Sequence, residues 1–172
     1  MPPPEIRPLA PDSASIDALA SLLIETVAGG GSVGFMHPVA PDKARAFARA
    51  SLDAAARGER LVLGAFVEGA LASTVTLLLA LPENQPHRAE IAKMMTAPAF
   101  RGRGLARALL LEVERQAVAR GRTLLVLDTA EEDGAAGLYE KHGFLPAGRL
   151  PDYALKPHGG LTATLLYVKR IG

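Results

Sequence analysis

Hydrophobic residues along the chain follow two spacings, and each spacing predicts a different kind of element. Apolar residues three and four positions apart predict amphipathic helices over residues 16–29, 42–57, 105–120 and 133–142. Alternating or continuous apolar residues predict strands over residues 5–9, 60–67, 70–81, 89–96, 123–127, 144–148 and 161–170. The remaining polar or glycine-rich segments are expected to be loops, chiefly residues 29–39, 82–88, 128–132 and 151–160.

The order of these elements predicts one mixed α/β domain that spans residues 1–172. Strand 89–96, helix 105–120 and strand 123–127 form a strand–helix–strand unit. The two strands of such a unit normally lie side by side and parallel, with a right-handed crossover between them. Ligands in such sheets bind beyond the carboxyl ends of the strands, so the site is expected there.

Composition and charge exclude several classes of protein. The chain of 172 residues has no cysteine, which excludes disulfides, thiolate nucleophiles and zinc–cysteine sites. A net charge of +1, with five phenylalanines, three tyrosines and no tryptophan, offers little attraction or stacking surface to nucleic acid. The most apolar run, residues 71–81, is too short for a membrane span, and no signal peptide begins the chain. A cytoplasmic protein without membrane association is therefore expected. No metal is expected either, because the histidines lack metal-ligand spacing; they are His37, His87, His142 and His158.

A glycine- and arginine-rich turn before helix 105–120 is the strongest candidate for a ligand site. Gly102 and Gly104 allow unusual dihedrals and close approach of a ligand, and the helix that follows presents unpaired N–H groups. Such a helix start binds phosphate, and three arginines add positive charge: Arg101, Arg103 and Arg107. The Walker and dinucleotide patterns are both absent. The alternative is a tight turn that needs no ligand.

Three residues could carry acid–base chemistry. Glu90 and Asp128 lie on strands predicted to be neighbours, so their carboxylates can face one cleft. Such carboxylates can act as general bases toward a bound molecule, and Tyr139 can act as a general acid. Each has a structural alternative: Glu90 pairs with Arg88, Asp128 caps the turn after its strand, and Tyr139 packs in the core.

The glycine-rich loop 29–39 is expected to form one wall of a substrate pocket. Ser32, Phe35 and Met36 lie in this loop, and Tyr153 lies in loop 151–160, which could close over a small molecule with it. The alternative for the apolar residues of loop 29–39 is a small hydrophobic cluster separate from the main core.

Two motifs resemble those of the GNAT N-acetyltransferase superfamily. They are Arg101-x-x-Gly104-x-Ala106 and the segment Ala135-Ala136-Gly137-Leu138-Tyr139, which continues to Gly143-Phe144. The resemblance implies a mostly antiparallel mixed sheet of about seven strands with flanking helices, splayed after its fourth strand. It implies acetyl-CoA as co-substrate, with Tyr139 as the acid for the thiolate.

The resemblance also implies which residues hold acetyl-CoA. The strand would bind the thioester and pantetheine arm through Met94, Met95 and Thr96, and the loop would bind the pyrophosphate through Arg101, Gly102, Arg103, Gly104, Leu105, Ala106 and Arg107. Many members of the superfamily have asparagine seven residues before the tyrosine, whereas this chain has Glu132.

A narrower resemblance, to the tabtoxin-resistance acetyltransferase group, covers most of the chain. It rests on Gly31 to Phe35, Arg88-Ala89-Glu90-x-x-Lys93, Leu127-Asp128-Thr129, and Leu150 to Ala154 followed by Leu161 to Lys169. It implies that Glu90 and Asp128 help to deprotonate the amine of a small amino-acid-like molecule.

The leading interpretation is therefore an N-acetyltransferase that uses acetyl-CoA. The primary amine of an amino-acid-like or antibiotic-like small molecule would attack the thioester directly, with a carboxylate as base. A protein or peptide amine is the alternative acceptor, and a non-catalytic acyl-CoA-binding module is the alternative class. A homodimer through the edge formed by the last strands is compatible with this fold.

Overall fold

The computed structural model describes residues 3–172, whose strands form one seven-stranded sheet in the order β1-β2-β3-β4-β5-β7-β6. Neighbouring strands are antiparallel except β4 and β5, which are parallel. The mixed, mostly antiparallel sheet of the sequence analysis is therefore confirmed. The strands are β1 (Glu5–Pro8), β2 (Arg60–Val67), β3 (Ala70–Leu78), β4 (Arg88–Thr96), β5 (Leu124–Ala130), β6 (Leu145–Leu155) and β7 (Leu161–Arg170).

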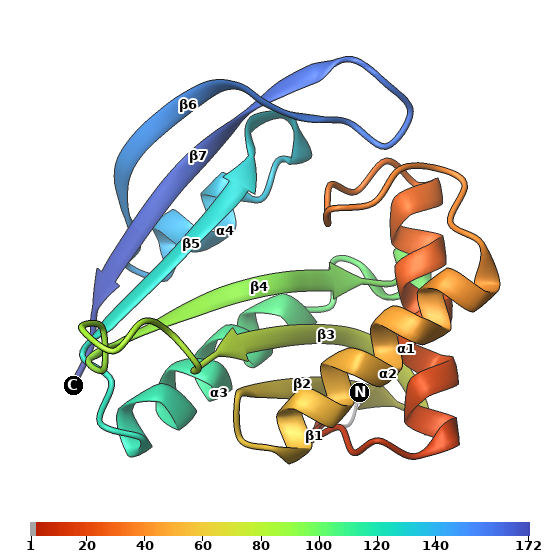
Figure 1. Cartoon of the computed structure of the whole chain (residues 1–172), viewed down its shortest axis with the longest axis horizontal. Coiled ribbons are helices and arrows are strands. Elements are labelled where there is room, and N and C mark those ends of the chain that lie inside the picture. The colour runs from red at the N-terminus through yellow and green to blue at the C-terminus, as the bar shows by residue number, and fades with distance from the viewer. Residues whose placement is uncertain (1–2) are drawn as a thin grey trace.

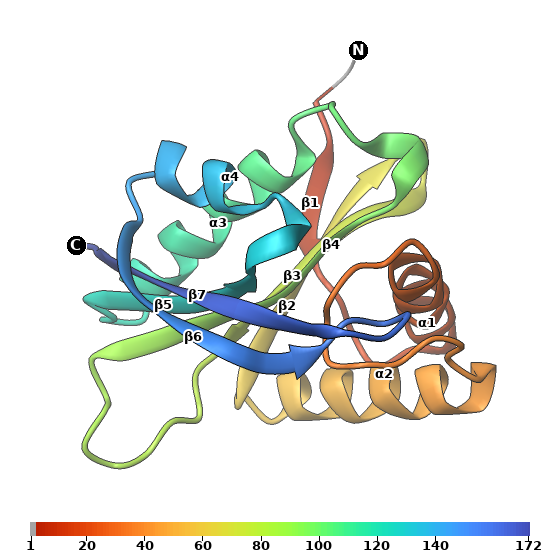
Figure 2. The ribbon, with the colours of Figure 1, turned by 90° about the horizontal axis from the view of Figure 1, so that it is seen from above.

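Helices cover both faces of this sheet. Helices α1 (Ser13–Ala28) and α2 (Pro41–Ala56) lie on one face, and α3 (Leu105–Ala119) and α4 (Ala136–Lys141) lie on the other (Figure 2). Each pair of helices buries its apolar stripe, with Leu23 and Leu52 in one core and Leu109 in the other. Within residues 3–172, none of the helices combines the length and the apolar character needed to cross a membrane.

The sheet splits between β4 and β5. The two strands pair only from Arg88 to Glu90, opposite Leu124 to Val126, and then diverge (Figure 1). Lys93 interrupts β4 with a φ of +52°, and the pairing of β3 with β4 shifts register between Thr74 and Thr76. The predicted splay after the fourth strand is confirmed, and it leaves a gap in the middle of the sheet.

The ends of two strands, β3 and β5, were predicted wrongly. Strand β3 ends at Leu78 rather than Leu81, because the N–H groups of Leu79 and Ala80 both donate to the carbonyl of Glu59. Strand β5 continues to Ala130 rather than ending at Leu127, so Asp128 belongs to the strand. The structural alternative, in which Asp128 caps the turn after its strand, is therefore wrong as well.

Two further boundaries were wrong near the C-terminus. Helix α4 begins at Ala136 rather than Asp133, because residues Glu131–Asp133 form a separate 3-10 turn. Much of the predicted loop 151–160 is strand, since β6 extends to Leu155. The strand accommodates Pro151 by a break in its pairing with β7 between Leu150 and Ala154.

Candidate active site

A cavity of about 780 Å³ fills the gap between β4 and β5. Its walls come from β4, the loop after α1, the end of β5 and the β6–β7 hairpin. Most residues proposed for thioester, substrate or catalysis line it: Ser32, Phe35, Met94, Met95, Thr96, Asp128, Tyr139 and Tyr153. Met36 does not line this cavity, and its side chain is 45% exposed.

A second cavity of about 470 Å³ lies at the start of α3 and adjoins the first. It is lined by most of the predicted pyrophosphate loop, namely Arg101, Gly102, Gly104, Leu105, Ala106 and Arg107. Arg103 lies outside it, with its guanidinium over the ring of Phe100 and hydrogen-bonded to the carbonyl of Ala99. The two cavities adjoin at the split in the sheet, because both are lined by Met94, Thr96, Arg101, Asp133 and Ala135.

The start of α3 has the features of an anion site. Gly102 and Gly104 have φ values of +74° and +76°, in the left-handed region that glycine adopts without strain. Gly104 is the N-cap residue, and no side chain caps the helix and no acidic residue lies in its first turn. The first N–H groups of α3 and the positive end of its dipole therefore face the second cavity.

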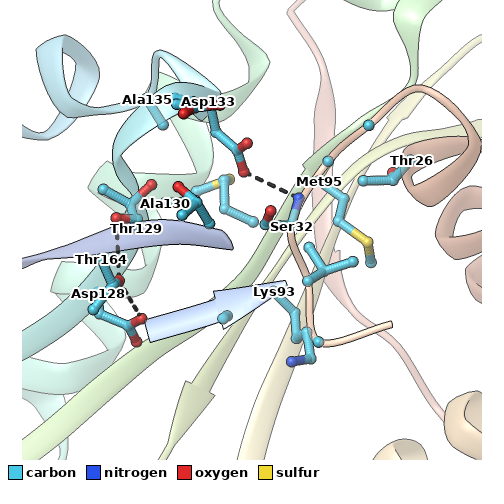
Figure 3. Close-up of a pocket in the computed structure, with 18 of the residues that line it drawn as sticks. Thr26, Ser32, Lys93, Met95, Asp128, Thr129, Ala130, Asp133, Ala135 and Thr164 are labelled. Atoms are coloured by element: carbon cyan, nitrogen blue, oxygen red, sulfur yellow. Dashed lines mark hydrogen bonds between the residues drawn. The ribbon is translucent and has the colours of Figure 1, made fainter. Parts of the chain in front are cut away.

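Asp128 presents its carboxylate to the larger cavity from the part of β5 that no longer pairs with β4 (Figure 3). Its position is fixed from the neighbouring strand, because the hydroxyl of Thr164 donates to Asp128 Oδ2 at 2.7 Å. The other carboxylate oxygen, Oδ1, makes no hydrogen bond within residues 3–172 and is available to an amine or a water molecule.

Glu90 lies outside both cavities. Its carboxylate forms an ion pair with Arg88 at 3.1 Å, and Arg88 also bonds to Gln85. In the sheet Glu90 is paired with Val126, two residues before Asp128, so the two carboxylates share a face but only Asp128 reaches the cavity.

Tyr139 is both a core residue and part of the cavity wall. It is 5% exposed and packs edge-on against Phe144, yet it lines the larger cavity. Burial, together with the negative charges of Asp128 and Asp133, raises the pKa of its phenol to about 12. The phenol is therefore protonated at any working pH and can donate a hydrogen bond into the cavity.

The sequence analysis did not assign Lys93 or Asp133, and both line the larger cavity. Burial lowers the pKa of the Lys93 ammonium, although the charge of Asp128 opposes that shift. Lys93 stands between Ile91 and Met95 as a charge in an apolar strand, a signal that could have drawn attention to it. Asp133 accepts a hydrogen bond from the backbone N–H of Ser32 at 3.0 Å across the cavity (Figure 3). Glu132 instead forms an ion pair with Lys156.

The two diverging halves of the sheet are joined again by their loops. The backbone N–H of His37 donates to the carbonyl of Pro157, and His158 Nε2 lies 2.9 Å from the carbonyl of Ala28. The rings of His37 and His158 are 4.5 Å apart. Loop 29–39 and the turn between β6 and β7 are thus in contact, and the cavity is bounded on this side.

Known proteins with this sequence pattern and fold are acetyltransferases. The model of the acetyltransferase (GNAT) family matches residues 33–144. An N-acetyltransferase from Staphylococcus aureus Mu50 is 19% identical, with a TM-score of 0.83 over 98% of this chain and 99% of that one.

Two further solved structures share the fold. A ribosomal-protein-alanine N-acetyltransferase from Brucella melitensis is 23% identical, with a TM-score of 0.80 over 97% of this chain and 99% of that one. The Salmonella typhimurium protein yncA, solved with its cofactor acetyl-CoA, is 19% identical, with a TM-score of 0.81 over 98% and 94% of the two chains.

Proposed function

The chain belongs to the acetyltransferase (GNAT) family, and from this we propose that it acts as a single domain that transfers an acetyl group from acetyl-CoA to the primary amine of a small molecule. The observation that carries the proposal is a pair of adjoining cavities at the split in the sheet, one with an anion site and the other with Asp128 and Tyr139. Such a pair of cavities suits a long anionic co-substrate and a separate acceptor.

The residues present fit acetyl-CoA. The N-terminus of α3, with Arg101 and Arg107 beside it, would hold the pyrophosphate in the smaller cavity. The end of β4 no longer pairs with β5, so the backbone groups of Met94 to Thr96 that face away from β3 would be those that hold the pantetheine arm and the thioester.

In the proposed reaction Asp128 is the general base. Supplying a free amine at pH 7 from an ammonium of pKa about 10.4 costs about 4.6 kcal/mol, so a base within reach assists attack. Asp128 accepts the proton directly or through one water molecule, while Thr164 keeps the carboxylate in place. Glu90 is occupied by Arg88 outside the cavity, and we assign it to support of β4 rather than to proton transfer.

Tyr139 would stabilise the leaving sulfur by a hydrogen bond. Full proton transfer from a phenol of pKa about 12 to a thiolate whose thiol has an ordinary pKa of about 8.5 is uphill by about 3.5 units. Donation of a hydrogen bond needs no such transfer and is strongest when the sulfur becomes negative. The proton released by the attacking amine can then reach the sulfur through solvent.

Two conservative substitutions test the assignment of the base. We expect Asp128→Asn to lower kcat by about 100-fold or more, the usual range for a lost general base, and Glu90→Gln to lower it by only a few fold. Turnover is followed as release of free coenzyme A, with a panel of amino acids, simple amines and peptides as acceptors. Thermal unfolding with excess acetyl-CoA provides the control, since both variants should keep the upward shift of the wild-type protein.

Three results would contradict the proposal. Unchanged turnover in Asp128→Asn would show that Asp128 is not the base, and loss of turnover in Glu90→Gln alone would show that Glu90 is. No shift of the unfolding temperature with acetyl-CoA would leave the family assignment without a working co-substrate site.

A small acceptor is favoured over a protein by the loops that bound the cavity, since His37 and His158 bring them into contact. The likeness to the tabtoxin-resistance group, which rests on sequence motifs, points to an amino-acid-like molecule. The reaction draws on acetyl-CoA, and we propose a cytoplasmic location accordingly. Acetylation of peptides alone from the same panel would favour the protein acceptor instead.

A further inference from the structure

The ammonium of Lys93 is a cation in the acceptor part of the cavity without a direct partner. Lys93 lies where β4 leaves its regular pairing, with a φ of +52°, and its side chain lines the larger cavity (Figure 3). Within residues 3–172, Lys93 Nζ forms no hydrogen bond and no ion pair. The residue is partly buried and lines the cavity, so a bound anion can pair with the ammonium there.

The glycine-rich loop is shaped around this ammonium. A Cβ added to Gly34 would lie 3.4 Å from Lys93 Nζ, and Gly34 has a φ of +89°, which other residues rarely adopt. The loop therefore passes close to the ammonium on one side. Burial is also the main cause of the lowered pKa of Lys93.

The acidic groups that line the same cavity already have partners. Asp128 accepts from Thr164, Asp133 accepts from the Ser32 N–H, and Glu132 pairs with Lys156. The hydroxyl of Ser32 is different, because it is buried and has no hydrogen-bond partner within the described chain. The Ser32 hydroxyl is closed off from solvent, so the Lys93 ammonium is the group without a partner that a bound anion can reach in this cavity.

We propose that Lys93 Nζ binds a carboxylate of the acceptor, so that the amine presented to Asp128 belongs to an amino acid. The inference rests on the proposed function and names its substrate class. Lys93 projects from β4 and Asp128 from β5, on opposite sides of the split in the sheet (Figure 3). A carboxylate on Lys93 would direct the neighbouring amine toward Asp128, and the ion pair would keep Lys93 protonated and therefore unreactive toward the acetyl group.

Matched pairs of acceptors test the proposal. Each pair consists of an amino acid and the amine that lacks only its carboxylate: alanine with ethylamine, phenylalanine with phenethylamine, and lysine with cadaverine. Thermal unfolding is measured with each compound in the presence of coenzyme A, and kcat/KM is measured with acetyl-CoA. The proteins are wild type, Lys93→Met, Lys93→Arg and the control Lys141→Met, which makes the same change on the exposed surface of α4 outside both cavities.

We expect the wild-type protein to prefer the carboxylated member of at least one pair by about 10- to 100-fold, the range of a hydrogen bond to a charged group. Lys93→Met should abolish the preference while retaining the response to acetyl-CoA, Lys93→Arg should keep part of it, and Lys141→Met should keep it whole. The ratio within each pair cancels differences in fold stability between the variants.

Two outcomes would overturn the inference. In the first, the two members of every pair shift the unfolding temperature of the wild-type protein equally, a measurement that needs no turnover. Alternatively, Lys93→Met would weaken both members of each pair equally. Failure of the proposed function looks different, since no amine would then be acetylated even though the carboxylated members bind in a Lys93-dependent way.

Discussion

At the scale of single residues, Tyr139 shows how a packed side chain can also serve a site. Its ring is held by Phe144 and Tyr167, while one part of the residue borders the cavity. The sequence alternatives of core packing and catalysis therefore do not exclude each other. The same burial that fixes the ring raises the pKa of its phenol to about 12.

The raised pKa of Tyr139 predicts a loss of stability at high pH. Between pH 10 and about 12 the unfolded state loses the phenol proton while the folded state keeps it, so the free energy of unfolding falls as pH rises. Two units correspond to about 3 kcal/mol. Urea unfolding from pH 8 to 12 should fall less steeply in Tyr139→Phe than in the wild type. Equal slopes for the two proteins would contradict the prediction.

Single residues also mark the limit of what the sequence predicts. The glycine turn before α3 could be recognised, because its glycines and arginines indicate both an unusual backbone and a charge. Lys93 had a signal, as a charge in an apolar segment, but its orientation toward the cavity depends on a break in strand pairing that the sequence does not show. For Glu90 the sequence suggested both a base and a partner of Arg88, but it does not show that the carboxylate lies outside the cavity.

At the scale of elements, long periodic segments were predicted well and irregular ones were not. Helices α1, α2 and α3 follow their apolar spacing closely, since burial of one stripe decides them. Strand β6 was predicted too short, because Pro151 and Asp152 suggested a loop, whereas an edge strand tolerates proline. The end of β5 was misplaced because Asp128 reads as a polar terminus although it is paired with β7.

The contact between Asp133 and Ser32 predicts how the glycine-rich loop is ordered. In Asp133→Ala the Ser32 N–H loses its acceptor, and loop 29–34 should loosen. A contribution of about 1 kcal/mol corresponds to an increase of about fivefold in KM for the amine and in amide hydrogen exchange of the loop. Asp133→Asn keeps an acceptor oxygen and is the matched control. An unchanged exchange rate in Asp133→Ala would show that other contacts hold the loop.

At the scale of the whole molecule, the sheet ends in an exposed apolar edge. Strand β6 is the outer strand next to β7, and all of its residues are exposed. Large apolar side chains gather there, at Leu145, Leu150, Tyr153 and Leu155. An exposed edge with such side chains normally marks a contact with another chain.

This edge predicts a homodimer in solution. Sedimentation velocity at micromolar concentration should give twice the chain mass of 18.0 kDa for the wild-type protein. The double variant with Leu145→Lys and Leu150→Lys should sediment as a monomer, because two charges would be buried at the contact. Leu111→Lys is the control, since Leu111 is 56% exposed on α3, away from β6. A monomeric wild-type protein would contradict the prediction of a dimer through this edge.

The split between β4 and β5 has a kinetic consequence. With the co-substrate in the smaller cavity and the acceptor in the larger one, as proposed, neither would need to leave before the other enters. Both can be bound together, and no acetylated enzyme intermediate is required. Coenzyme A should accordingly inhibit competitively against acetyl-CoA but not against the amine, and initial-rate plots should intersect rather than run parallel.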